Sequence, residues 1–325
     1  MTKSIAKGSV CVTGAGGYVA SWLIKLLLSN GYTVHGTVRD PPQDEKYLHL
    51  RNLENAEEKL KLFKAHLFDY DSMVAAISGC KGVFHVASPV PSGSVQNPEV
   101  ELVETAVKGT QNVLMAALEA NVNRVVFVSS VAAVQVNPAM SKDQLVDETC
   151  WSDKDFCRNT NNWYCLSKTE AEMKAMEFAK RSKGLDLVTL CPGLVFGPKL
   201  QPSINNSSWF LINFIKGMMQ EETDNLFRMI VDVRDVARAL LLVYEKPESE
   251  GRYICSAHSI RPKGLAEMLK KIYPSAKYFN NFNEENRDQR KISSDKLQKL
   301  GWTFMPLEQT LADSVENYKR AGLLD

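Results

Sequence analysis

The chain has 325 residues, of which 44% are hydrophobic and 24% charged, and its formal net charge is +1. Such a length and composition belong to a globular protein with ample apolar material for a sizeable core, and the near-zero charge argues against a nucleic-acid partner. No apolar run reaches the length of a membrane span, and residues 1–8 carry no apolar signal region.

Seven cysteines are present, without the spacing of zinc ligands. We therefore expect no metal site, and a reducing, cytoplasmic location. Cys150 and Cys157 flank a short segment and could pair under oxidising conditions, but two free thiols are the expectation.

The first predicted unit is a strand, a glycine turn and a helix. Ser9 to Thr13 is a β-branched run that ends in Gly14-Ala15-Gly16-Gly17, and Tyr18 to Asn30 has apolar residues at helical spacing. Such a turn presents backbone N–H groups and the positive end of a helix to a phosphate. Its glycines let the backbone approach a pyrophosphate, and the small Ala20 allows close packing of helix and strand. We expect dinucleotide binding here; the alternative is a tight connection with no ligand.

Thr33 to Arg39 is predicted as the second strand. A residue about 20 positions after the glycines contacts the adenosine ribose. Arg39 offers a planar cation for a 2′-phosphate, with Lys46 as a second cation, whereas Asp40 could instead bind ribose hydroxyls. The sequence therefore predicts NADP(H) rather than NAD.

Strands and helices continue to alternate along the chain. This order predicts parallel pairing in a doubly wound, Rossmann-type α/β sheet, whose ligands lie beyond the carboxyl ends of the strands. Gly14, Arg39, Val86 to Ser88, Ser129-Ser130 and Cys191-Pro192-Gly193 all lie at such ends. The further predicted elements are the strands Lys61 to Leu67, Gly82 to Ala87, Arg124 to Ser130 and Leu185 to Leu190, and the helix Asn97 to Asn121.

Tyr164 and Lys168 are four residues apart, next to a predicted helix from Leu166 to Arg181, and should share one helical face. We expect the ammonium to lower the pKa of the phenol from about 10 toward working pH, so that the tyrosine can give a proton to a carbonyl oxygen as hydride reaches its carbon. The alternative is a ring that only packs. A second pair, Tyr273 and Lys277, contains Pro274 directly after the tyrosine, which argues against a continuous helix there.

Ser129 and Ser130 end the fifth strand, where a hydroxyl could donate to a substrate carbonyl beside the tyrosine. A cap or turn role is the alternative for either serine alone. With Tyr164 and Lys168 predicted at the same edge of the sheet, a Ser-Tyr-Lys set is coherent.

After Pro192 the chain becomes rich in Pro, Asn, Ser and Gly. We expect residues 1–190 to form the nucleotide-binding domain and 191–325 a smaller α/β substrate region, with 225–256 returning to the first. Ser208 to Met219 is predicted as a helix whose Trp209, Phe210 and Met218 pack in a core or form an apolar substrate wall.

The remaining elements of this region follow from hydrophobic pattern. The strands Arg228 to Val231 and Arg252 to Ser256 and the helix Val233 to Glu245 are expected to return to the main sheet. Gly264 to Ile272 and Leu307 to Ala321 are predicted surface helices, and Phe279 to Arg290 a polar loop.

Several motifs together resemble an extended short-chain dehydrogenase/reductase of the plant cinnamoyl-CoA reductase and dihydroflavonol reductase group, over nearly the whole chain. They are Val12-Thr13-Gly14-Ala15-Gly16-Gly17-Tyr18, Thr37-Val38-Arg39, Phe84-His85-Val86-Ala87-Ser88-Pro89, Val128-Ser129-Ser130, Cys150-Trp151-Ser152, Asn162-Trp163-Tyr164-Cys165 with Lys168, and Gly251-Arg252-Tyr253-Ile254-Cys255-Ser256.

The resemblance implies a Rossmann fold, NADPH and a catalytic triad of Ser130, Tyr164 and Lys168. It also implies cofactor contacts from Gly14, Gly16, Gly17, Tyr18, Val19, Arg39, Lys46, Val86, Ala87, Ser88, Tyr164, Lys168, Pro192, Gly193, Leu194, Val195 and Ser207.

The chain departs from this group at several positions. Leu166 and Ser167 replace a usual Tyr-Gly, and His66 stands where relatives commonly have Asp near the adenine. Phe210 and Asn213 stand where cinnamoyl-CoA reductases carry a His and, three residues later, a Lys. Coenzyme A brings several phosphates that need cations, so these losses favour the aldehyde-reducing, cinnamyl-alcohol-dehydrogenase-like branch.

The expected function is therefore NADPH-dependent reduction of a phenylpropenyl aldehyde, such as cinnamyl or coniferyl aldehyde, to its alcohol, as in plant lignin biosynthesis. Ser130 would orient the carbonyl, and Trp209, Phe210 and Met218 would contact the aromatic ring. Alternatives are reduction of a hydroxycinnamoyl-CoA to the aldehyde, reduction of a flavonoid-type or other ketone, and a non-catalytic NADP-sensing module. A monomer or weak homodimer is expected.

Overall fold

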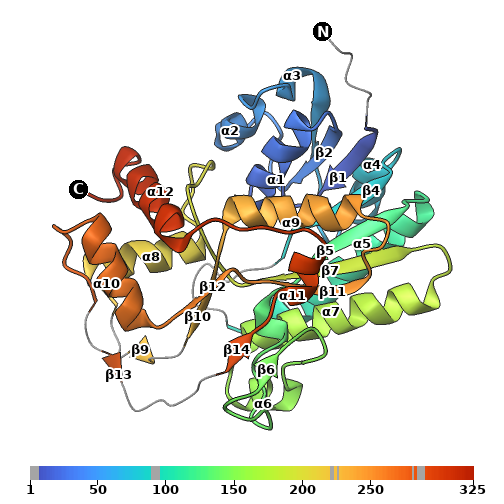
Figure 1. Ribbon diagram of the computed structural model, residues 1–325. Coiled ribbons are helices and arrows are strands. Elements are labelled where there is room, and N and C mark those ends of the chain that lie inside the picture. Colours follow the sequence, from blue (N-terminus) through green and yellow to red (C-terminus); the bar gives the residue numbers. More distant parts are fainter. Residues whose placement is uncertain (1–6, 89–95, 220–222, 225–226, 280–281, 284–289) are drawn as a thin grey trace.

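Seven parallel strands form the main sheet of the computed structural model, in the order β11-β7-β5-β4-β1-β2-β3 (Figure 1). The structure describes residues 7–88, 96–219, 223–224, 227–279, 282–283 and 290–325. The strands are β1 (Ser9–Val12), β2 (Thr33–Val38), β3 (Leu60–Lys64), β4 (Gly82–His85), β5 (Arg124–Val128), β7 (Asp186–Pro192) and β11 (Gly251–Cys255).

The central strands are apolar because helices cover both faces of the sheet. Every residue of β4 is buried, and so are the last four residues of β5, as expected for parallel strands with two covered faces. β1 lies between β2 and β4, with Val10 opposite both Val34 and Gly82. The strand order reverses at this point, which is where ligands bind in doubly wound sheets. The predicted fold class is therefore confirmed.

The long helices form two layers. α1 (Tyr18–Ser29) packs against α9 (Val233–Glu245) on one face, whereas α4 (Tyr70–Ile77), α5 (Thr105–Glu119) and α7 (Trp163–Arg181) pack side by side on the other (Figure 1). Shorter helices are α2 (Leu48–Arg51), α3 (Ala56–Lys59), α6 (Lys154–Asn159) and α11 (Asp295–Lys299), with 3₁₀ turns at Glu45–Tyr47 and Val131–Ala133 and a π-helical segment at Glu99–Glu104. Within the described ranges, no helix combines the length and apolarity needed to cross a membrane.

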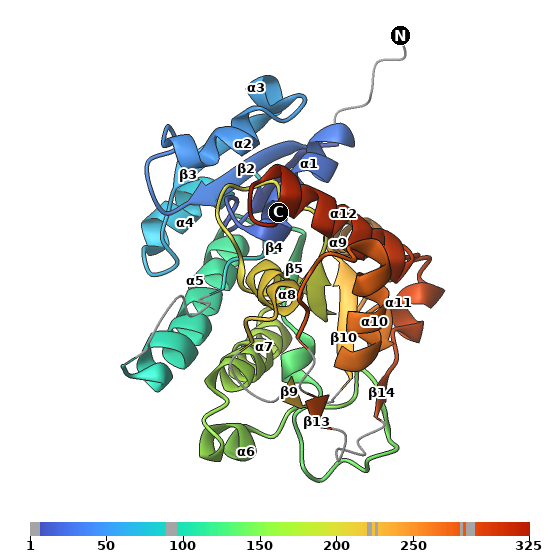
Figure 2. The ribbon, with the colours of Figure 1, turned by 90° about the vertical axis from the view of Figure 1, so that its left-hand side faces the viewer.

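The C-terminal part has a core of its own. A three-stranded sheet of β8 (Leu194–Phe196), β10 (Arg228–Asp232) and β12 (His258–Ile260) is accompanied by α8 (Asn206–Lys216), α10 (Pro262–Ile272) and α12 (Leu307–Arg320) (Figure 2). Two small sheets pair β13 (Phe282–Asn283) with β9 (Thr223–Asp224) and β14 (Lys291–Ile292) with β6 (Leu145–Val146). The predicted loop 279–290 lies mostly outside the described residues.

The placement predicted for residues 228–231 in the main sheet is wrong. β10 runs parallel to β8 and antiparallel to β12 instead, while β11 occupies the position beside β7. The two sheets diverge at Gly193, where a Cβ atom would collide with the carbonyl oxygen of Met229. Only glycine therefore allows β10 to approach the chain at this point. The domain division at residue 190 stays a prediction.

The loop 197–199, which we call the clamped loop, is held from two sides. From α1, the Tyr18 hydroxyl donates to the Gly197 carbonyl (2.8 Å) and the Trp22 indole N–H to the Pro198 carbonyl (2.7 Å). From α12, Ser314 Oγ accepts from the Gly197 N–H (2.9 Å), and the Asn317 amide bonds both backbone groups of Lys199 (3.0 and 3.1 Å). The helices α1 and α12, which are far apart in the sequence, are thus tied to one loop.

Candidate active site

Tyr164 lies in the first turn of α7. The helix begins at Trp163 because the Asn162 side chain caps it, accepting from the Cys165 N–H (3.4 Å). Tyr164 and Lys168 therefore fall one turn apart on one face, as predicted. Tyr164 keeps 36% of its surface exposed, whereas Lys168 is buried and donates to the Val128 carbonyl at the end of β5 (3.3 Å). The lysine lies beneath a tyrosine that a ligand can reach.

The two serines after β5 have different partners. The Ser130 hydroxyl lies close enough to the Tyr164 phenol to lower its pKa, and it accepts from the Ala132 N–H (3.1 Å). Ser129 is buried and donates to the Glu172 carboxylate (2.6 Å). Of the two, Ser130 is therefore the serine that can share a carbonyl oxygen with Tyr164.

The predicted lowering of the Tyr164 pKa by Lys168 is wrong for this structure. Burial raises the pKa of Tyr164, and the neighbouring Ser130 hydroxyl only partly opposes this rise. Burial also lowers the pKa of Lys168 to about 8, against the effects of Glu172 and Cys191. At neutral pH the tyrosine is protonated, which is the form that a proton donor needs.

The glycine turn has the geometry of a phosphate-binding loop. Gly14 has φ +69°, and a Cβ atom there would lie 3.1 Å from Ala87. A Cβ on Gly16 would lie 2.7 Å from the Tyr47 ring. No side chain caps α1, which follows Gly17 directly, so the first N–H groups of this helix remain available to an anion. Tyr18 and Val19 form its first turn, and these residues fit the pyrophosphate of a dinucleotide.

A buried hydrogen-bond network fixes the chain beneath this turn. Thr13 Oγ1 accepts from the N–H groups of Val86 (3.1 Å) and Ala87 (3.0 Å) and lies 2.9 Å from His85 Nδ1, while His85 Nε2 lies 3.2 Å from Thr110 Oγ1. Since Thr13 already accepts twice, its proton goes to Nδ1, and Nε2–H donates to Thr110. Burial lowers the pKa of His85 to about 3, so the ring is neutral. Ala87, and with it Ser88, is held beside Gly14.

The predicted 2′-phosphate site contains one exposed cation and one paired cation. Arg39 follows β2 and is exposed. Lys46 forms ion pairs with Asp40 and, at 3.7 Å, with Asp44. The hydrogen bond from Lys46 lowers the pKa of Asp40. Because its carboxylate is paired, Asp40 is a poor partner for ribose hydroxyls, and the arrangement favours a phosphate at Arg39.

The segment after β7 borders the same edge of the sheet. The Gly193 N–H donates to the Cys255 carbonyl (3.0 Å), which aligns Pro192 to Val195 between the two sheets. Ser207 lies in the first turn of α8 and accepts from the Asn205 amide (2.8 Å). Their cofactor contacts stay predictions.

The three predicted substrate-wall residues have different surroundings. Phe210 is half-buried and stacks with Phe196 and Phe214, at centroid distances of 6.4 and 6.0 Å. Trp209 on α8 and Met218 just after it are 58% and 63% exposed. Phe210 therefore contributes to the second core, whereas Trp209 and Met218 are available to a ligand. All three substrate roles stay predictions.

Sequence reasoning missed Glu172 and Arg252, which form a buried ion pair (2.7 Å) below the active site. The feature of the sequence that could have identified Glu172 is its spacing of four residues from Lys168, which places it one helical turn further along α7.

Other predicted features lie apart from this site. All seven cysteines are free, and Cys150 and Cys157 lie in different core clusters. The exposed His66 accepts from the Phe68 N–H (3.3 Å) at Nδ1, and its effect on adenine binding stays a prediction. Among the described residues, no group of His, Cys, Asp or Glu side chains could hold a metal ion.

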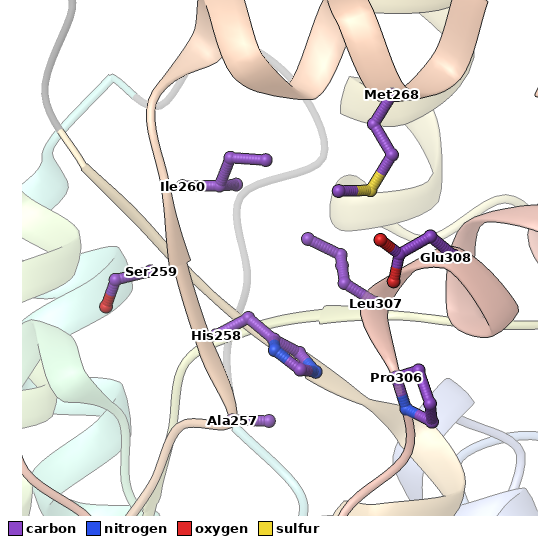
Figure 3. Close-up of a pocket in the computed structure, with 8 residues that line it drawn as sticks. All are labelled: Ala257, His258, Ser259, Ile260, Met268, Pro306, Leu307 and Glu308. Atoms are coloured by element: carbon purple, nitrogen blue, oxygen red, sulfur yellow. The ribbon is translucent and has the colours of Figure 1, made fainter. Parts of the chain in front are cut away.

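A cavity of about 490 Å³ opens in the C-terminal part, between β12, the middle of α10 and the start of α12 (Figure 3). The His258 ring is held by the Met305 carbonyl (2.7 Å). None of the predicted site residues lines this cavity, whose lining consists of Ala257, His258, Ser259, Ile260, Met268, Pro306, Leu307 and Glu308.

Comparison with known proteins identifies relatives across the whole chain. Residues 10–255 match the family described as the NAD dependent epimerase/dehydratase family. Cinnamoyl-CoA reductase 1 of Petunia hybrida is 46% identical, over 99% of this chain and 95% of the relative.

Two solved structures have the same fold. Vestitone reductase from alfalfa has a TM-score of 0.85 at 32% identity, covering 98% of this chain and 100% of that one. The yeast methylglyoxal/isovaleraldehyde reductase Gre2, complexed with NADPH, has a TM-score of 0.84 at 28% identity, with coverage of 97% and 100%.

Proposed function

The chain belongs to the NAD dependent epimerase/dehydratase family. On that premise, we propose that it uses NADPH to reduce the C1 carbonyl of a phenylpropanoid. The first candidate substrate is a hydroxycinnamoyl-CoA thioester. The prediction of an NADP-dependent oxidoreductase is confirmed by the family match and by the reductase relatives. The observation that supports the chemistry is that Ser130, which follows β5, and Tyr164 are close enough to interact, with the buried Lys168 one helical turn beyond the tyrosine.

Each site residue has a role that its position supports. When bound, NADPH supplies a hydride to the carbonyl carbon. Ser130 and Tyr164 hydrogen-bond the carbonyl oxygen, and Tyr164 gives it a proton as negative charge develops there. Lys168, buried beneath, provides a positive charge that stabilises the resulting phenolate.

The expected preference for an aldehyde is not confirmed, because the relatives favour the thioester alternative. In the thioester reaction the added hydride produces a tetrahedral carbon whose oxygen is held by Ser130 and Tyr164. The C–S bond then breaks, the carbonyl re-forms as an aldehyde, and the departing thiolate takes up a proton. One hydride and one proton are consumed for each aldehyde and free thiol formed.

Aldehyde reduction remains a second candidate because of one feature of α8. Phe210 belongs to an aromatic stack, and the Asn213 amide donates to the Trp209 carbonyl (2.9 Å). Neither position supplies a cation for the phosphates of coenzyme A. With an uncharged aldehyde, addition of hydride and of the Tyr164 proton gives the alcohol directly.

An NADPH-consumption assay with feruloyl-CoA, coniferaldehyde and a flavonoid-type ketone, compared by kcat/KM, tests the proposal. The highest value with feruloyl-CoA would support the thioester substrate, and the highest with coniferaldehyde would replace it by the aldehyde. Turnover of neither phenylpropanoid by a protein that binds NADPH would overturn the substrate class. A cytoplasmic location is part of the proposal, because seven free thiols suit a reducing compartment.

A further inference from the structure

Glu172 is a fully buried carboxylate that none of the roles above uses. It lies on α7, and its two oxygens accept charge-assisted hydrogen bonds from other elements. Ser129 Oγ donates to Oε2 (2.6 Å), and Arg252 Nε donates to Oε1 (2.7 Å). A buried carboxylate is tolerated only when paired and hydrogen-bonded in this way.

Arg252 is itself fixed on all sides. One of its terminal nitrogens donates to the carbonyls of Glu148 (2.9 Å) and Cys150 (2.7 Å), and its guanidinium carbon lies 3.6 Å from the centre of the Trp151 ring. The guanidinium therefore cannot follow Glu172 if that side chain moves. It holds the carboxylate in one orientation.

Glu172 and Lys168 converge on the end of β5. They are one helical turn apart, so their Cβ atoms are about 6 Å from each other. Lys168 donates to the carbonyl of Val128 (3.3 Å), and Glu172 accepts from the side chain of the next residue, Ser129. Both are buried, so their charges act on one another with little screening by water.

We infer that Glu172 is a positioning residue for the reduction: its buried carboxylate keeps the Lys168 side chain charged and directed at the end of β5, and Arg252 holds that carboxylate in place. This inference rests on the proposed function only for the role of Lys168. It does not depend on which carbonyl compound is reduced.

The groups around Lys168 leave Glu172 as the principal source of negative charge among the described residues. His85 is neutral, because burial lowers its pKa to about 3. Cys191 is a neutral thiol, because burial raises its pKa well above the ordinary value. Tyr164 is protonated and Arg252 is a cation paired with Glu172. Burial lowers the pKa of Lys168 to about 8, and Glu172 opposes this fall.

The test is the pH dependence of Glu172→Gln, which keeps the shape of the side chain but removes its charge. We expect the pH above which kcat/KM falls to decrease by about one unit, the smallest effect typical of an opposite charge at close range. The NADPH dissociation constant, followed by fluorescence, should begin to rise at correspondingly lower pH. Glu172→Asp, which keeps the charge, should show both profiles as in the wild type. Ser129→Ala, which removes a hydrogen bond but no charge, should also leave both profiles as in the wild type.

The outcome that overturns the inference is a folded Glu172→Gln protein with the wild-type pH profile, whatever its absolute rate. If Glu172→Gln does not fold, the double variant Glu172→Gln/Arg252→Met removes both members of the pair. A wild-type pH profile in that variant would overturn the inference in the same way. NADPH binding supplies a reading even if the substrate assignment fails, so the two failures are distinguishable.

Discussion

The hydroxyl of Ser130 lies close enough to the phenol of Tyr164 to lower its pKa, although one residue follows a strand and the other lies in the first turn of a helix. In the proposed reaction this pair would give a carbonyl oxygen two donors, at the edge of the sheet where the glycine turn also lies. Under the same proposal, Lys168 would act through its charge rather than through a bond to the substrate.

Tyr164→Phe removes the proton donor while keeping the ring. We expect kcat to fall by about 10²- to 10⁴-fold, the usual contribution of a positioned acid, with NADPH affinity retained. Single-turnover kinetics and fluorescence titration measure the two quantities. Tyr273→Phe is the matched control, because its hydroxyl only donates to the Asp325 carbonyl (2.7 Å) at the surface. Equal activity of both variants would contradict the assignment.

Activity should fall as the pH rises past the pKa of Lys168, about 8. Below that pH the ammonium is present; above it the charge that stabilises the phenolate is lost. Since kcat/KM reports groups of the free enzyme, its fall at alkaline pH should have a midpoint near this value. Lys168→Arg should have a lower kcat/KM that no longer falls in this pH range.

The same titration has a consequence for stability. The unfolded lysine keeps its proton up to about pH 10.5, whereas the folded one loses it near 8. Between these values the unfolded chain binds more protons, so the contribution of Lys168 to the free energy of unfolding increases with pH. Lys168→Met should lose this increase in urea titrations at pH 8 and 10; an unchanged increase would assign it to another group.

Arg39→Ala should weaken NADPH binding without affecting NADH. A charged hydrogen bond to phosphate contributes about 1.5–3 kcal/mol, which corresponds to about 10- to 150-fold in the dissociation constant. Lys46→Ala should have a smaller effect, because that ammonium is already paired with Asp40. An equal loss of affinity for NADPH and NADH would mean that the 2′-phosphate does not bind at Arg39.

Arg124→Ala should destabilise the fold. The largely buried guanidinium pairs with Asp186 (2.6 Å) and donates to the carbonyls of Val243 (2.9 Å) and Lys246 (2.6 Å). Its removal leaves several acceptors without a partner, and we expect a loss of about 2–4 kcal/mol in urea unfolding. Arg181→Ala, which breaks an exposed ion pair, should cost less than about 0.5 kcal/mol.

Trp209→Ala tests the substrate wall. Loss of an exposed indole should raise KM for an aromatic substrate by about two- to tenfold, the range of an aromatic contact. The KM for a small aliphatic aldehyde should not change. Met115→Ala removes a comparably exposed side chain from α5 and should change neither. A change in KM for the aliphatic aldehyde would indicate a structural effect instead.

Local patterns predicted the elements that position the site. The glycine turn, the apolar strands and the Tyr164–Lys168 spacing each depend on residues close in sequence, and the structure has α1 at Tyr18–Ser29 and β5 at Arg124–Val128. Family membership and oxidoreductase chemistry followed from the combined motifs. The roles of the site residues, the domain boundary and the oligomeric state stay predictions.

Features set by distant partners could not be predicted in this way. The apolar pattern of β10 does not say which strand it joins; β11 already occupies the place beside β7, and β8 is free to pair. The pKa of Tyr164 depends on how deeply its oxygen is buried, which spacing to a lysine does not reveal. Arg252 meets Glu172 only because β11 returns to the main sheet.

The clamped loop also affects the order of events during synthesis. Tyr18 and Trp22 are synthesised long before Ser314 and Asn317, which complete the contacts of this loop. A nascent chain can form the first strands, but the loop beside α1 gains its second set of bonds only when α12 docks. The loop should therefore reach its final conformation only once α12 has been synthesised and has docked.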